Sequence, residues 1–234
     1  MRGWWQELAG LVLPVDCAGC GASRVLLCAG CREALSGAVT ARARPFPRPE
    51  GLPVVHAAAV YEGPVRAVLL AHKERGALPL AGALGAALAA AVRAGGAGAG
   101  EEVALVPVPS ARRQVRARGH DPARRIAFAA AGRLRRAGVP ARVAPVLRLR
   151  RAVADQAGLG ARQRRENLSG ALEVCRGGAR LTGGAVVVLV DDLITTGATL
   201  AEAARALRAA DPGGVAGLRA AVVAATRTDQ KSRE

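Results

Sequence analysis

The segment 186–200, VVVLVDDLITTGATL, limits the possible folds of this chain more than any other. Residues 186–190 form an apolar, β-branched run, which is typical of a strand buried on both faces of a parallel sheet. Two carboxylates, Asp191 and Asp192, follow this run, and a Thr/Gly turn then leads directly into a helical pattern. A buried strand, a polar turn and a helix in this order predict one unit of an α/β fold.

The rest of the chain repeats this alternation from about residue 54 onward. We expect strands at residues 55–61, 103–108, 141–147, 170–174, 186–190 and 217–224. We expect helices at residues 65–70, 78–93, 122–137 and 200–209. The polar stretch 148–169 interrupts the pattern, and an excursion of this length inside a compact domain is usually functional or mobile. The pattern predicts a parallel sheet flanked by helices.

The polar turn after residue 190 has the chemistry of a sugar-phosphate site. Asp191 and Asp192 can accept hydrogen bonds from two vicinal ribose hydroxyls at the carboxyl end of a parallel strand. The turn 195–199 offers backbone N–H groups and hydroxyls at a helix N-terminus, where a phosphate is favoured. Paired carboxylates also occur as magnesium ligands in phosphatases and as the acid and base of hydrolases. Neither alternative explains the hydroxyl-rich turn.

Four of the five cysteines form two CxxC pairs near the N-terminus, Cys17 with Cys20 and Cys28 with Cys31. Two such turns can place four thiolates tetrahedrally around zinc, and four protein ligands would make the site structural. Disulfides or redox chemistry fit less well, because nothing marks the chain as exported and no βαβ pattern flanks either pair. We therefore predict a structural zinc ion, and we expect the fifth cysteine, Cys175, to be a lone thiol.

The chain carries 34 basic against 18 acidic residues, a formal charge of +16, and 32 of its basic residues are arginines. This excess favours anionic partners, although a compositional bias toward arginine would produce it without any ligand. The segment from residue 112 to residue 165 contains 16 arginines and only two acidic residues, Asp121 and Asp155. That segment is either a solvated face or an anion-binding surface. We expect Lys73 and Arg75 to be solvated cations.

The sequence shows no secretory or membrane segment, so we expect a cytoplasmic protein without membrane insertion. The 16 apolar residues at 77–92 are mostly Ala and Gly, and they predict a buried helix rather than a membrane span. We expect four parts: a zinc-knuckle module at 1–40, a linker at 41–53, the α/β domain at 54–226 and a polar tail at 227–234.

Taken together, the motifs resemble those of a known family. They are the four-cysteine knuckle, Tyr61-Glu62-Gly63 with Lys73, VPVPS followed by Arg118-Gly119-His120, Gln156 with Arg165 and Asn167-Leu168-Ser169, and the DD-TTG segment. In this order they resemble the ComF family, which includes ComFC-type competence proteins and GntX-like proteins. The segment 186–200 itself looks like the phosphoribosyl pyrophosphate (PRPP) motif of type I phosphoribosyltransferases.

This resemblance implies roles for individual residues. Asp191 and Asp192 would be the catalytic residues that hold the ribose hydroxyls. The loop of Thr195, Thr196, Gly197 and Thr199 would hold the 5-phosphate. Ser110, Arg118 and Gly119 would form the pyrophosphate loop, and Gln156, Arg165 and Asn167 would belong to a flexible loop that closes over the substrate. The family usually has an aromatic residue and Asn after Arg-Gly, where this chain has His120 and Asp121.

Two functions follow from the resemblance. The first is a phosphoribosyltransferase that binds PRPP with Mg²⁺ and transfers phosphoribosyl to an unidentified acceptor with release of pyrophosphate. The alternative is a non-catalytic competence protein that binds single-stranded DNA and a DNA-uptake helicase.

Overall fold

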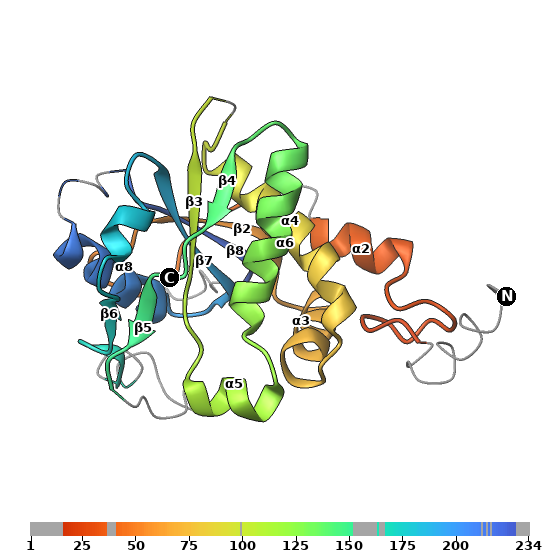
Figure 1. Cartoon of the computed structure of the whole chain (residues 1–234). Helices are drawn as coiled ribbons and strands as arrows, with labels where there is room; N and C mark the ends of the chain where they lie inside the picture. Colours follow the sequence, from red (N-terminus) through yellow and green to blue (C-terminus); the bar gives the residue numbers. More distant parts are fainter. Residues whose placement is uncertain are drawn as a thin grey trace, which may run out of the picture.

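A computed structural model of the chain describes residues 16–36, 41–98, 100–151, 163, 167–211, 213, 215 and 217–227. Six strands form one sheet in the order β1-β2-β8-β7-β3-β4 (Figure 1). They are β1 (Ala41–Ala43), β2 (Val54–Val60), β8 (Arg219–Ala225), β7 (Val186–Ile194), β3 (Val103–Pro107) and β4 (Ala141–Val143). All neighbours are parallel except β1, which pairs antiparallel with β2. The expected parallel α/β sheet is confirmed.

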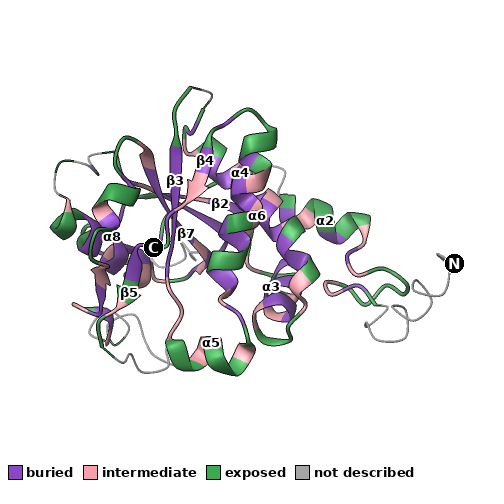
Figure 2. Cartoon of the chain, viewed as in Figure 1, coloured by how far each residue is buried: buried purple, intermediate pink, exposed green. Residues whose placement is uncertain are grey.

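The central strands are mostly apolar because helices cover both faces of the sheet. The helices α3 (Gly63–Glu74), α4 (Ala81–Ala94) and α6 (Pro122–Arg136) contribute to one core, and α8 (Ala198–Ala210) contributes to the other. β3 is buried along its whole length, and Figure 2 shows the buried residues concentrated in the sheet and on the inner helix faces. Burial on both faces explains the continuous apolar runs in the sequence.

Two expectations about the strands were wrong in detail. Residues 141–147 form two short strands, because β4 ends at Val143 and β5 (Leu147–Leu149) leaves the main sheet. β5 pairs antiparallel with β6 (Leu172–Val174) in a separate small sheet. Buried Glu202 of α8 fixes this sheet, because its carboxylate accepts the Leu172 N–H at 3.0 Å. The period of a short apolar run does not reveal which sheet it joins.

Other boundaries also moved. α5 (Arg112–Arg118) was not expected, because its seven residues contain five polar side chains and none of the seven is buried. β7 continues through the two carboxylates to Ile194, paired with β8, rather than ending at residue 190. The segment predicted to be a linker contains the edge strand β1. The division of the chain into four parts stays a prediction.

The cysteine segment packs on the α/β domain rather than standing apart from it. Its helix α2 (Ala29–Ser36) contacts α3, α4 and β2 (Figure 1). Cys17, Leu27, Cys31 and Leu35 are buried in the same core as α3 and α4. The segment and the domain therefore share one hydrophobic core.

α4 and α6 approach closely at a glycine. A Cβ added at Gly85 of α4 would lie 2.5 Å from Ala129 Cβ and 2.8 Å from the backbone of α6, whereas one added at Gly82 would meet nothing within 4 Å. The Ala and Gly residues of α4 therefore have a packing function, since a larger side chain at Gly85 would push α6 outward.

We predict that Gly85→Ala destabilises the protein by about 1–3 kcal/mol, because overpacking forces the two helices apart. Gly82→Ala, in the same helix, is expected to stabilise it by up to about 1 kcal/mol, because Ala has the higher helix propensity. Urea unfolding followed by circular dichroism measures both. Equal effects of the two substitutions would contradict the close approach.

Candidate functional site

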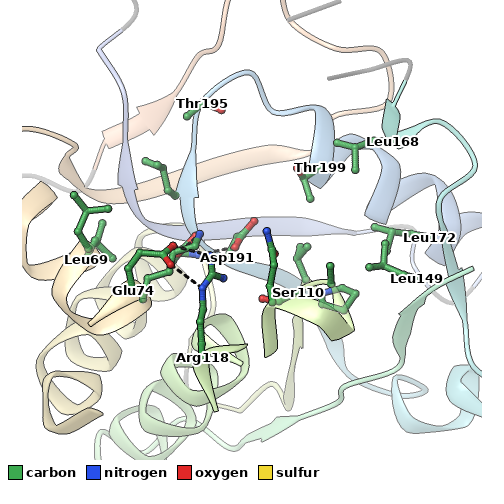
Figure 3. A pocket seen from close by; sticks show the side chains of 18 of the residues that line it. Leu69, Glu74, Ser110, Arg118, Leu149, Leu168, Leu172, Asp191, Thr195 and Thr199 are labelled. Atoms are coloured by element: carbon green, nitrogen blue, oxygen red, sulfur yellow. Dashed lines mark hydrogen bonds and ion pairs between the residues drawn. The ribbon is translucent and has the colours of Figure 1, made fainter. Parts of the chain in front are cut away.

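A pocket of about 480 Å³ opens where the parallel strands β2, β3 and β7 end (Figure 3). This is the edge of an open α/β sheet where ligands bind. The lining residues come from α3, from the segments that follow β2 and β3, from β5 and β6, and from the end of β7 and the start of α8. Those that carry the argument are Tyr61, Lys73, Glu74, Ser110, Arg118, Leu149, Leu168, Leu172, Asp191, Asp192, Thr195 and Thr199.

The two carboxylates at the end of β7 have different surroundings. Asp192 is buried, with 5% of its surface exposed, and it accepts a hydrogen bond from Lys73 Nζ at 2.7 Å. Asp191 is half-buried, and its Oδ1 accepts the backbone N–H of Asp192 at 2.8 Å. Adjacent residues of a strand point to opposite faces, so the pair does not present two equivalent oxygens to one ligand atom.

The positive charge of Lys73 compensates the negative charges of these carboxylates, contrary to our expectation that Lys73 is a solvated cation. Burial opposes its charge, but the attraction of Asp192 and Asp191 outweighs burial and raises the pKa of Lys73. Burial raises the pKa of Asp191 well above its usual range, and the charge of Asp192 adds to this shift while Lys73 opposes it. One ammonium therefore compensates two carboxylates that lie close together.

The sequence contained a signal for Lys73 that our interpretation did not use. Lysine occurs twice in the chain, at 73 and 231, among 34 basic residues. A bias toward arginine does not account for a lysine at this position. A compact ammonium can reach a buried carboxylate that the larger, planar guanidinium would fit poorly.

The turn between β7 and α8 brings part of the expected phosphate loop to the pocket. Thr195 and Thr199 line the pocket, whereas Thr196 and Gly197 do not. Thr196 Oγ1 accepts the Ala198 N–H at 3.4 Å, and Gly197 has φ 77°, a left-handed conformation that favours glycine. A side chain at Gly197 would also meet Leu52 at 3.0 Å. These two residues therefore shape the turn while their neighbours face the ligand space.

Ser110 and Arg118 line the opposite side of the pocket, and Gly119 does not. Gly119 ends α5 in a left-handed conformation, with φ 74°. The Arg118 guanidinium forms a two-oxygen ion pair with Glu74, with Nε–Oε2 at 2.8 Å and Nη2–Oε1 at 2.7 Å (Figure 3). No pattern in the sequence marks Glu74 as a site residue, since an exposed glutamate near a helix end is ordinary.

Both residues that depart from the family pattern have structural contacts. His120 is buried, and its two ring nitrogens lie 3.1 Å from the carbonyl oxygens of Arg118 and His72. Asp121 caps α6 by accepting the Arg124 N–H at 3.2 Å, and its other oxygen accepts the Ser110 N–H at 3.4 Å. The Asp121 carboxylate therefore stabilises both the loop that contains Ser110 and the N-terminus of α6.

Of the three residues predicted to belong to the flexible loop, the structure describes Asn167. Its carbonyl oxygen accepts a hydrogen bond from Arg151 Nη2 at 2.9 Å. Gln156 and Arg165 lie outside the described residues.

The four N-terminal cysteines form a second cluster, and none of them lines the pocket. The Sγ atoms of Cys17, Cys20, Cys28 and Cys31 all lie within 4.8 Å of one another. Four sulfurs at about 2.3 Å from one zinc ion would be about 3.8 Å apart. The Cys20 and Cys28 sulfurs are 3.6 Å apart, and the Cys28 N–H donates to Cys17 Sγ at 3.3 Å. The cluster therefore fits a zinc ion.

The thiols of this cluster differ in acidity. Burial opposes ionisation of Cys17, but hydrogen bonds from the backbone and from Cys31 outweigh it and lower its pKa to about 6. Burial and the neighbouring sulfurs raise the pKa of Cys31 above its usual range. Ionisation of the Cys17 thiol is therefore favoured, whereas ionisation of the Cys31 thiol is opposed. A bound dication would offset the repulsion between neighbouring thiolates.

The comparisons with known proteins agree with this geometry. Residues 151–234 match the family described as phosphoribosyl transferase domain. No curated protein sequence matches the chain. The chain thus combines a C-terminal segment that matches the phosphoribosyl transferase domain, an α/β fold with a mostly parallel sheet, and a four-cysteine cluster near the N-terminus. Among the described residues, no helix has the length and apolar character needed to cross a membrane.

We predict that Asp191→Asn stabilises the ligand-free protein at about pH 7. The folded-state pKa of Asp191 lies above its unfolded value of 3.8, so folding stability falls as the pH rises from about 4 through the folded pKa. Asn has no charge to bury, and its advantage over Asp191 should vanish below about pH 4. Urea unfolding at several pH values tests this, with Asp211→Asn at the far end of α8 as the control. A difference that does not vary with pH would refute it.

We predict that Cys17→Ser or Cys28→Ser releases zinc from the purified protein, while Cys175→Ser, outside the cluster, retains it. Elemental analysis by mass spectrometry measures the metal directly. Because the cluster shares a core with α3 and α4, the loss should also lower the melting temperature of the whole domain. Equal zinc contents in all three variants would exclude the site.

Proposed function

We propose that this protein is a PRPP-binding phosphoribosyltransferase of the ComF type, which transfers phosphoribosyl from PRPP to an acceptor and releases pyrophosphate. The observation that carries the proposal is that one pocket gathers two carboxylates, the threonines at the start of α8, and the cations Lys73 and Arg118. Three of these groups were selected from the sequence for separate parts of the same ligand: ribose, 5-phosphate and pyrophosphate.

Each group has a task in binding PRPP. Thr195 and Thr199 would donate to the 5-phosphate at the α8 N-terminus, where the helix dipole favours an anion. The carboxylates would accept hydrogen bonds from the ribose hydroxyls, and the positive charge of Lys73 opposes the rise in the pKa of Asp191. Arg118 and the Ser110 hydroxyl would face the pyrophosphate. Mg²⁺ bound with PRPP would neutralise part of the pyrophosphate charge.

The reaction needs little covalent chemistry from the protein. The bond between the anomeric carbon and the pyrophosphate oxygen breaks, and a nitrogen nucleophile takes the carbon. The pocket would hold the two reactants in line and stabilise the charge on the leaving group. Leu149, Leu168 and Leu172 line the side formed by β5, β6 and the preceding turn (Figure 3). An apolar wall of this kind would exclude water from the reacting carbon.

We predict that the purified protein binds PRPP in the presence of Mg²⁺, and that Asp191→Asn with Asp192→Asn abolishes the binding. Isothermal titration calorimetry measures it, with Asp211→Asn as a matched control that removes a carboxylate at the other end of α8. Pyrophosphate release in a screen of nitrogen nucleophiles would then identify the acceptor. No binding by the wild-type protein at millimolar PRPP would refute the proposal.

The alternative function, binding of single-stranded DNA in competence, is favoured by one surface. α5 and α6 expose Arg112, Arg113, Arg116, Arg124, Arg125, Arg133, Arg135 and Arg136. Phe128 of α6 is 52% exposed, with the Arg124 guanidinium 5.7 Å from its ring centre. An exposed aromatic ring among arginines is suited to stacking of a base beside a phosphate. A DNA-uptake helicase as partner belongs to the same hypothesis.

If this surface binds DNA, Phe128→Ala should weaken oligonucleotide binding by at least about 1 kcal/mol, through loss of stacking. Leu181→Ala is the control, because Leu181 is equally exposed, at 53%, on η2 (Gly178–Leu181). Fluorescence anisotropy at roughly 50 mM salt and above measures the affinity and its salt dependence. Binding that is insensitive to salt, or unchanged in Phe128→Ala, would contradict the hypothesis.

A further inference from the structure

The Arg118 guanidinium already holds an anion that belongs to the protein. Its Nε and Nη2 donate to the two carboxylate oxygens of Glu74 at 2.8 and 2.7 Å. This parallel, two-bond arrangement is the one that arginine forms with a phosphate group. Both side chains line the pocket and point toward one another (Figure 3). The Glu74 carboxylate therefore occupies the position that a ligand phosphate would take on Arg118.

The pair is accessible enough to be exchanged. The Glu74 side chain is 43% exposed and the Arg118 side chain 16%. Ion pairs of exposed carboxylates contribute little stability, about 0–1 kcal/mol, because the freed carboxylate is hydrated again. Glu74 lies at the end of α3, so its side chain can turn to solvent without unfolding a helix interior.

The backbone of Arg118 is anchored without Glu74. His120, two residues further on, packs its buried ring between the carbonyl oxygens of Arg118 and His72. Asp121 ties the same loop to Ser110 and to the N-terminus of α6. The Arg118 guanidinium can therefore change partner while its loop stays in place.

The adjacent residue of α3 holds the other side of the pocket. Lys73 Nζ pairs with buried Asp192, and Glu74 pairs with Arg118. The carboxylates of the two contacts differ in exposure, because the Asp192 side chain is 7% exposed and the Glu74 side chain 43%, whereas the Lys73 and Arg118 side chains are 35% and 16% exposed. An anionic ligand would thus displace Glu74 from Arg118 and leave Lys73 with Asp192.

We propose that Glu74 is an internal substitute for a ligand phosphate, which neutralises Arg118 in the empty pocket and is displaced when a diphosphate group binds. The proposal rests on the proposed function in one respect, the assignment of Arg118 to the pyrophosphate of PRPP. Its consequence is that Glu74 competes with the ligand, so the native affinity for pyrophosphate is lower than the pocket allows. A residue that only positioned Arg118 would have the opposite effect.

Titration calorimetry with inorganic pyrophosphate tests this on the full chain. Glu74→Gln removes the charge with little change of shape, and it is expected to bind pyrophosphate about two- to fivefold more tightly than wild type. Glu74→Asp keeps the charge but is one methylene too short for the two-oxygen contact, and it should also bind more tightly. Glu102→Gln breaks a comparable exposed pair with Arg142, outside the pocket, and should match wild type.

The outcomes separate this proposal from the proposed function. Tighter pyrophosphate binding by both Glu74 variants supports the substitution, whether or not PRPP binds in a parallel titration. Unchanged or weaker binding by Glu74→Gln overturns it, and PRPP binding by the same protein would still stand. Wild-type affinity in Glu74→Asp overturns the direct exchange in favour of a long-range charge effect. Tighter binding by Glu102→Gln as well would also overturn it, by showing that net charge alone decides.

Discussion

The pocket depends on the ion pair between Lys73 of α3 and Asp192 of β7. β7 is buried between two hydrophobic cores, and it continues through two consecutive carboxylates. A buried carboxylate without a cation would be unstable in its ionised form. Lys73 supplies the cation and thereby links a peripheral helix to the central strand. α3 is then placed so that Glu74 reaches Arg118, and the loop after β3 closes the pocket.

The pocket holds its charges in two ways. Asp192 is buried and its partner Lys73 is half-buried, whereas the carboxylate of the second pair, Glu74, is exposed. Electrostatic energy is larger where water is excluded, so the first pair is a fixed part of the site and the second can be exchanged. The proposed ligand, a polyphosphate sugar, would need both kinds of pair, because the pocket must compensate its carboxylates and also let Arg118 exchange Glu74 for the ligand. The loop anchored by His120 and Asp121 makes the exchange a movement of side chains.

The fold was largely predictable because the buried strands are continuous apolar runs. β2, β3, β7 and β8 and the helices α4, α6 and α8 lie close to their expected positions. The elements that were predicted wrongly or not at all lack a clear local sequence pattern. β5 and β6 are three-residue strands that are too short to show a period, and their pairing depends on contacts with α8. α5 has five polar residues among seven and buries none of its side chains fully, so it shows no apolar period either. β7 extends through Asp191 and Asp192 because β8 offers backbone partners there, which outweighs the low strand propensity of Asp.

The sequence by itself determined the α/β class, the four cysteines that meet in one cluster, and the carboxylate and threonine groups that face the pocket. Residue type and spacing are enough to predict these three features, because each feature depends on residues that lie close together in the chain, in one strand, one turn or one cysteine knuckle. The tertiary structure alone decided the pairing of Lys73 with Asp192 and of Glu74 with Arg118, which join residues 119 and 44 positions apart. It also gave His120 and Asp121 their contacts. Such pairs depend on how helices lie on the sheet, and no local sequence pattern predicts contacts between residues so far apart in the chain.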